Sequence, residues 1–180
     1  MQRKTATSVG VVSLLAIGFV ASWITNEQST PKGADDNGND RADVIYLGSA
    51  GVVFQSRSNT CGVAALLMVL DHFGIKSSRQ EMEQKAELHH GGTSLMALKE
   101  LAKKVGVEAD GWRLSFQELA GIELPAILFV EKHHFIVVDS VNGSGILFVR
   151  DPAVGRLAIP RRRALEIWKG ETLVITHASR

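Results

Sequence analysis

The first strongly apolar stretch of the chain runs from Val9 to Ile24. Arg3 and Lys4 precede it, and no acidic residue occurs before Asn26. At about 1.5 Å per residue, a helix of this length spans about 24 Å, less than the hydrocarbon core of about 30 Å. A positive flank before such a run is typical of secretory signals. We therefore predict that residues 1–25 are a signal peptide or an N-terminal membrane anchor, and that the rest is exported.

A polar segment follows the apolar one. Residues 26–43 are rich in Asp, Asn and Gly and show no hydrophobic period. This composition predicts a disordered linker, drawn here as residues 26–45. Residues 46–180 show no repeats and are long enough for one domain with its own core.

Helices are predicted in the first half of this domain. The stretch Cys61–Phe73 is apolar on almost every face, which predicts a buried helix, with Asn59 or Thr60 as its cap and Gly74 as its end. Further helices are predicted from capping residues and from the 3.6-residue period at 78–88, at 93–105 and from Ser115 onward.

Strands are predicted mainly in the second half. The β-branched and aromatic runs predict strands at 44–46, 52–54, 125–130, 134–140, 146–150 and 173–176. Residues 142–145 (NGSG) are typical of a hairpin turn, and Pro160 predicts a helix that ends near Gly170. Helices first and antiparallel strands later indicate an α+β fold, with the helices packed on the sheet.

Composition narrows the function. The formal net charge is +1, with 45% hydrophobic and 22% charged residues, so a polybasic nucleic-acid binder is not expected. The chain has one cysteine, Cys61, which excludes an intramolecular disulfide and a cysteine-rich metal site. We expect no cofactor, and contact with a membrane only through the N-terminal segment.

Cys61 stands at the predicted start of the buried helix, where the helix dipole favours a thiolate. The alternative is that it is simply a small buried residue. A nucleophilic thiol needs a base, and His133 or His134, at the start of a strand, is the candidate. Successive strand side chains point to opposite faces, so only one of the two can face the helix.

An orienting group and an oxyanion donor complete the chemistry of acyl transfer. Asp151 follows the strand paired with that of the histidines, and can accept a hydrogen bond from the imidazole. Asp139 and Asn142 are weaker candidates for this role. The Gln55 side chain and the backbone N–H of Cys61 are candidate donors to an oxyanion.

These residues resemble a known family. The resemblance rests on QSRSNTCGVAAL at 55–66, Gly-Thr-Ser-Leu at 92–95, Leu-Pro-Ala-Ile at 124–127, His-Phe-Ile-Val-Val at 134–138, and Asp-Pro at 151–152 with Gly155. In this order they resemble the double-glycine leader peptidases that process bacteriocins, family thirty-nine of the cysteine peptidases. The resemblance implies a papain-like fold, with Cys61 as nucleophile, His134 as base, Asp151 as orienter and Gln55 as oxyanion donor.

The resemblance also implies a function. It implies a cysteine endopeptidase that processes leaders or propeptides of exported polypeptides, which cuts after a double-glycine type of motif. Many members are fused to ABC transporters, for which 180 residues leave no room. We therefore expect a free-standing, exported member, periplasmic or anchored on the extracytoplasmic side, whose partners are a polypeptide substrate and components of a secretion or surface-fibre system. Thr60 departs from the acidic residue that is common in the family at this position.

Other interpretations remain open at this point. A domain of this fold can bind a peptide without cutting it, and acyl transfer to an amine is chemically equivalent to hydrolysis. A metal hydrolase would use His89, His90, His133, His134 and Asp151, but these residues lack a metal-binding spacing. Gly91-Gly92 is interpreted as a turn, and Arg161–Arg163 as a solvated face or as a contact for acidic substrate or lipid headgroups.

Overall fold

The structure is a computed structural model that describes residues 44–86, 88 and 92–176. The predicted signal or anchor, residues 1–25, lies outside the described residues, as do most of the predicted linker, His89, His90 and Gly91. Across the described ranges, no helix is both long enough and apolar enough to cross a bilayer.

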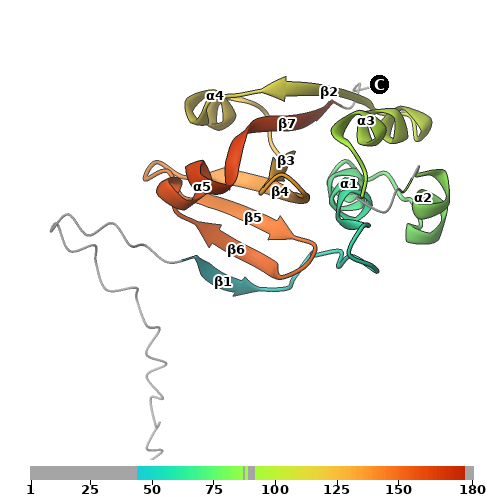
Figure 1. The fold of residues 1–180 in the computed structure, drawn as a ribbon, viewed down its shortest axis with the longest axis horizontal. Coiled ribbons are helices and arrows are strands. Elements are labelled where there is room, and N and C mark those ends of the chain that lie inside the picture. Colours follow the sequence, from blue (N-terminus) through green and yellow to red (C-terminus); the bar gives the residue numbers. More distant parts are fainter. Residues whose placement is uncertain (1–43, 87, 89–91, 177–180) are drawn as a thin grey trace, which may run out of the picture. The chain divides into compact units, whose positions relative to one another are not determined.

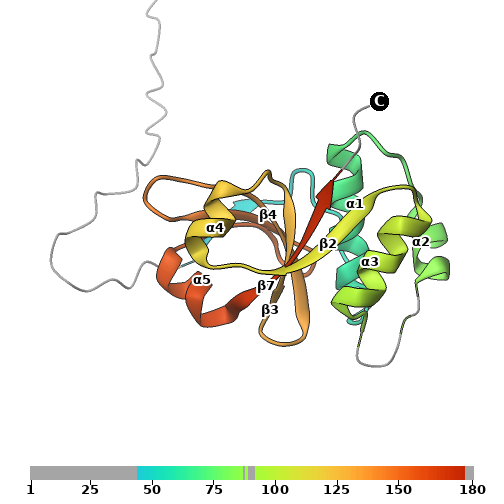
Figure 2. The ribbon, with the colours of Figure 1, turned by 90° about the horizontal axis from the view of Figure 1, so that it is seen from above.

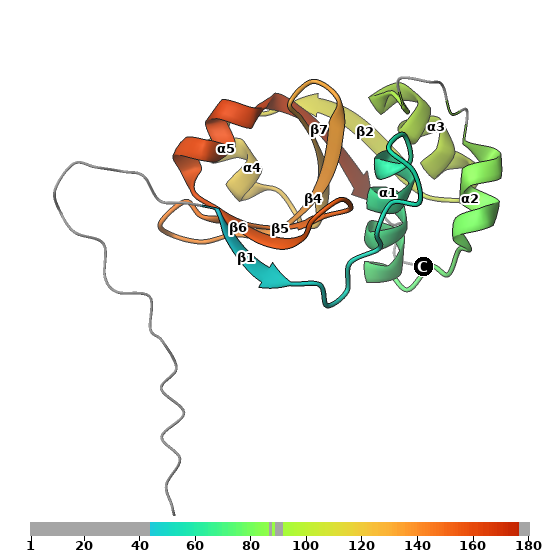
Figure 3. The ribbon, with the colours of Figure 1, turned by 60° about the horizontal axis from the view of Figure 1, so that its bottom comes forward.

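Seven strands form one sheet in which every pairing is antiparallel. The strands are β1 (Ile45–Gly48), β2 (Glu108–Arg113), β3 (Ala126–Val130), β4 (His134–Val141), β5 (Leu147–Asp151), β6 (Gly155–Ile159) and β7 (Trp168–Thr176). Their order across the sheet is β1-β6-β5-β4-β3-β7-β2. Figure 3 shows the sheet curling, with β1, β6 and β5 along its lower side and β7 and β2 along its upper side.

Five helices flank this sheet. They are α1 (Cys61–His72), α2 (Arg79–Lys85), α3 (Leu95–Lys104), α4 (Phe116–Gly121) and α5 (Arg161–Ile167). Figures 1 and 2 show α1, α2 and α3 grouped on one side of the sheet, with α4 and α5 on the other.

Alternate residues along the central strands supply two hydrophobic cores. Ile127 on β3 and Val137 on β4 pack with α1 and α3 in the first core. Leu128 and Ile136, one position along, pack with α4 and α5 in the second core. Because side chains alternate along a strand, this sheet is apolar on both faces and is covered by helices on both. The α+β prediction is confirmed, with the first three helices packed on the antiparallel sheet.

Several local predictions are confirmed. Helix α1 starts at Cys61 and is followed by Gly74 at φ +73°, a conformation that glycine adopts readily. The Ser94 hydroxyl accepts a hydrogen bond from the backbone N–H of Ala97 and caps α3. Ser115 and Glu118 cap α4 reciprocally, as a capping box.

The predicted strand at 52–54 is wrong. The backbone N–H of Val52 donates to the carbonyl of Ser49 at 3.1 Å, so the chain turns there. Val52 and Val53 pack against the first core instead of pairing in the sheet. Their apolar character serves packing, since β1 already occupies the outer side of β6.

The hydrophobic pattern also misplaces three boundaries and misses two strands. Helix α2 ends at Lys85 rather than at residue 88, α5 ends at Ile167, and β7 begins at Trp168 rather than at 173. Strands β2 and β6 are not predicted at all. The residues of β2 are exposed except Ala109, and their extended conformation comes from pairing with β7. Gly170 ends no helix: it lies in β7, where an added Cβ would approach the Leu114 carbonyl to 2.7 Å.

Candidate active site

Cys61 is the first residue of α1 and is only 3% exposed. Thr60 precedes the helix, but its hydroxyl makes no hydrogen bond to the helix. Instead it accepts from the backbone N–H groups of Ser56 and Arg57, at 3.0 and 3.1 Å, and donates to the carbonyl of Arg57. Thr60 therefore orders the loop before Cys61, and does not act as the helix cap that the sequence suggests.

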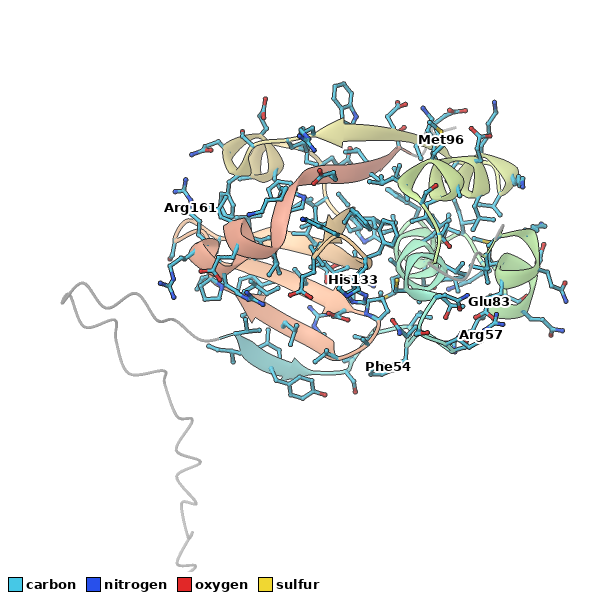
Figure 4. All side chains as sticks on the ribbon, viewed as in Figure 1. Phe54, Arg57, Glu83, Met96, His133 and Arg161 are labelled. Atoms are coloured by element: carbon cyan, nitrogen blue, oxygen red, sulfur yellow. The ribbon has the colours of Figure 1, made fainter. Side chains whose placement is uncertain are left out.

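The same loop is tied to helix α2. Glu83 accepts hydrogen bonds from the Ser56 hydroxyl at 2.6 Å and from the Arg57 guanidinium at 3.1 Å. Figure 4 shows Arg57 and Glu83 beside each other. The loop between Gln55 and Cys61 is thus held from inside by Thr60 and from outside by Glu83.

His134 is the first residue of β4, and it faces Asp151, the last residue of β5. The two atoms His134 Nε2 and Asp151 Oδ1 are 2.9 Å apart. The backbone N–H of Ala153 also donates to Asp151 Oδ1, at 2.7 Å. Because an ionised carboxylate can only accept, Nε2 carries the proton, which leaves Nδ1 as the ring nitrogen available to Cys61.

The pKa of the Cys61 thiol shows that the thiol interacts with His134. Burial raises this pKa. Hydrogen bonds with the His134 side chain and the Phe135 backbone, the charge of His134, and a hydrogen bond with the Gly62 backbone outweigh burial. The pKa of Cys61 is therefore below its ordinary value, which increases the fraction of reactive thiolate at a given pH.

The pKa of His134 moves in the opposite direction. Burial lowers it, but hydrogen bonds with Asp151 and Cys61 and the charges of both raise it to about 9. A depressed thiol pKa beside an elevated imidazole pKa favours a thiolate–imidazolium pair. Such a pair can attack a carbonyl carbon and then protonate a leaving group.

Gln55 lies on the loop that approaches Asp151. Its backbone N–H donates to the carbonyl of Pro152 at 2.9 Å, which attaches the loop to the Asp-Pro segment. Its side-chain Oε1 is buried and has no hydrogen-bond partner among the described residues. A buried polar atom without a partner is rare in a packed core and more common in binding sites.

The alternative residues lie elsewhere. His133 is exposed, with its Nδ1 2.6 Å from the carbonyl oxygen of Glu131 (Figure 4). Asp139 binds Arg150, and Asn142 accepts from the N–H groups of Ser144 and Ile146 within its own turn. The structure thus brings Cys61, His134 and Asp151 together without these three residues.

The described residues also bear on the metal-site and basic-run interpretations. In the part of the chain that the structure covers, no group of three His, Cys, Asp or Glu side chains could hold a metal ion. In the basic run, Arg163 pairs with Glu131 and Glu166, and Arg161 lies 5.0 Å from the centre of the Phe116 ring. Two of the three arginines therefore have partners within the domain.

Sequence reasoning missed one residue of the site region. Arg150 directly precedes Asp151 and is only 9% exposed. The signal that was available is a charged residue inside the apolar run Leu-Phe-Val-Arg-Asp, because an arginine is almost never fully buried without partners.

Comparisons with known proteins agree with this architecture. The model of the peptidase C39 family matches residues 49–180. An uncharacterized protein of Methanothermobacter marburgensis is 33% identical over 130 residues, which cover 72% of this chain and 91% of that protein. FapD of Pseudomonas aeruginosa, described as a probable functional amyloid protease, is 27% identical over 132 residues, 67% of this chain and 58% of that protein.

A solved structure has the same fold. It is the crystal structure of a double glycine motif protease from an AMS/PCAT transporter in complex with the leader peptide. The match has a TM-score of 0.64 and 24% sequence identity, and covers 75% of this chain and 92% of that one. The described domain therefore has the papain-like fold of these peptidase domains.

Proposed function

This chain belongs to the peptidase C39 family, and on that premise we propose that it is a cysteine endopeptidase that cuts exported polypeptides. One observation supports the proposal above all. The only cysteine of the chain stands at a helix start with its pKa lowered by His134, whose other ring nitrogen is 2.9 Å from Asp151. These are the nucleophile, the base and the orienting group that acyl transfer to a thiol requires.

The proposed reaction has two steps. The Cys61 thiolate attacks the scissile carbonyl carbon, and the Gln55 amide and the Cys61 N–H donate to the oxyanion that forms. The tetrahedral intermediate collapses as the C–N bond breaks, and the imidazolium of His134 transfers its proton to the leaving amine. His134 then takes a proton from water, which attacks the thioester, and the carboxylic acid and the free thiol are released.

We propose that the substrate is a leader or propeptide of an exported protein, cut after a double-glycine type of motif. The similarity to a double glycine motif protease and to an amyloid protease supports this substrate class. The partners would then belong to a secretion or surface-fibre system. We also propose that residues 1–25 carry the domain across the membrane as a signal or anchor; a reporter fused after residue 45 and active only outside the cytoplasm tests this point.

The experiment compares the full chain with two variants. Secreted proteins from a deletion strain are incubated with wild type, with Cys61→Ala and with Cys61→Ser, and new N-termini are identified by mass spectrometry. We expect new termini with wild type only. Equal processing by wild type and Cys61→Ala rejects the proposal, and so does the absence of any new terminus when the folded wild type binds the polypeptide intact, which indicates a non-cleaving peptide-binding module.

A further inference from the structure

Arg150 is a buried charge that the proposed chemistry does not use. It lies on β5, next to Asp151, and its side chain is 11% exposed. Side chains of neighbouring strand residues point to opposite faces, so Arg150 faces α1 while Asp151 faces His134. The described residues show no hydrogen bond between Arg150 and Cys61, His134 or Asp151.

The guanidinium is almost fully engaged by other groups. Its Nε lies 3.0 Å from each carboxylate oxygen of Asp139, and Nη2 lies 2.7 Å from Asp139 Oδ1. Its Nη1 donates to the carbonyl of Gly51 at 3.2 Å and to that of Met68 at 3.4 Å. A buried charge is tolerated when it is paired and its donors are satisfied, and Arg150 meets both conditions.

These acceptors lie on three different segments. Asp139 is on β4, which begins with His134, and Met68 is on α1, which begins with Cys61. Gly51 is on the loop that leads to Gln55, and Arg150 itself is next to Asp151. One planar guanidinium therefore connects every segment that carries a proposed site residue.

We propose that Arg150 is a positioning residue that fixes the geometry of Cys61, His134, Asp151 and Gln55 by binding the four segments that carry them. The proposal rests on the proposed function. The fork of five N–H donors has a rigid geometry, so it can serve a carboxylate and two carbonyls at once. A lysine at this position is a single point donor and can serve only part of the set. A displacement of about 1 Å between reacting groups costs about 100-fold in rate.

The test compares Arg150→Lys and Asp139→Asn with Arg156→Lys as a matched control. Arg156 also faces Asp139, but at 3.7 Å and from a side chain that is 34% exposed. Three quantities are measured on the full chain: kcat and KM on a cleaved polypeptide, the thermal midpoint, and the rate of Cys61 alkylation by iodoacetamide as a function of pH.

We expect Arg150→Lys to lower kcat by about 10- to 100-fold and to change KM less than about 3-fold. The alkylation profile moves toward that of an ordinary thiol, because Cys61 and His134 are no longer held together. Asp139→Asn has a smaller effect in the same direction, and Arg156→Lys matches wild type.

Two results overturn the proposal. One is an Arg150→Lys variant with the wild-type kcat and the wild-type alkylation profile. The other is a loss of activity that parallels a loss of folded protein, with normal kcat per alkylatable cysteine, which indicates a role in stability alone. If wild type cleaves nothing, the proposed function fails, yet the alkylation profile still decides whether Arg150 positions the site.

Discussion

His134 and Asp151, 17 residues apart in the chain, are joined by a contact of 2.9 Å between Nε2 and Oδ1. Their side chains are only 17% and 12% exposed. The hairpin of β4 and β5 brings the start of one strand near the end of the other, and the backbone N–H of Ala153 fixes the carboxylate. The imidazole is thus oriented before any substrate binds.

Replacing Asp151 with Asn tests this orientation. We expect kcat/KM to fall by about 10²- to 10⁴-fold, because the amide neither fixes the tautomer nor stabilises the imidazolium. The pKa of His134 should fall from about 9 toward its ordinary value of 6.5, which histidine NMR measures. His133→Gln is the matched control, since His133 is exposed and contacts only the Glu131 carbonyl among the described residues. An unchanged pKa in Asp151→Asn would contradict the assignment.

The rate should depend on pH through both partners of the pair. As the pH rises through the lowered pKa of Cys61, thiolate accumulates and the rate rises; as it rises through about 9, His134 loses its proton and the rate falls. We expect a bell-shaped profile with its upper limb near pH 9. Because the two groups are coupled, the limbs belong to the pair rather than to either residue.

Alkylation of Cys61 checks the lower limb without a substrate. In wild type, iodoacetamide should react well below pH 9.0, the ordinary pKa of the thiol. In His134→Ala the reaction should shift to higher pH, because the thiol loses both the hydrogen bond and the charge of His134. Superimposable alkylation profiles for the two proteins would show that His134 does not activate Cys61.

Thr60→Val tests the loop before the nucleophile. The change removes one acceptor for two backbone N–H groups and one donor, at a residue that is 1% exposed. We expect a loss of about 1–3 kcal/mol in the free energy of unfolding, from denaturant titration. Thr60→Ser keeps the hydroxyl and should retain most of the stability; equal losses in the two variants would assign the effect to the methyl group instead.

The turn before His134 offers a stabilising change. Glu131 and Lys132 have φ values of 53° and 64°, and the N–H of His133 donates to the carbonyl of Val130 at 3.2 Å. Glycine is favoured at such positions, so Lys132→Gly should raise the free energy of unfolding by about 0.5–1 kcal/mol. Glu131→Gly should gain less, because it also loses the 3.1 Å ion pair with Arg163. A destabilised Lys132→Gly would show that its side chain stabilises the turn.

The elements that the sequence predicts best are those with local signals. Helix α4 carries its own capping box at Ser115 and Glu118, and the β4–β5 hairpin carries Asn142 and its glycines. Strand β2 has no such signal, since its exposed polar residues become a strand only through β7. The conformation of β2 depends on residues about 60 positions away, which a local period does not reveal.

The same distinction applies to the site. Cys61, His134 and Asp151 are predicted from the order of short motifs, and the structure brings them together. Arg150 is not predicted, because its partners Gly51, Met68 and Asp139 lie on three separate segments and two of them contribute only backbone carbonyls. A sequence pattern cannot identify a carbonyl as a partner.

The place of β7 in the sheet has a consequence for when activity can begin. Strands β3 and β2 lie on either side of β7, which is made from residues 168–176. During synthesis, Cys61, His134 and Asp151 all leave the ribosome before this strand, yet the sheet that supports them lacks an inner member until it docks. We therefore expect the growing chain to be inactive until residues 168–176 have emerged and paired, so the enzyme cannot cut neighbouring nascent chains while its own synthesis continues.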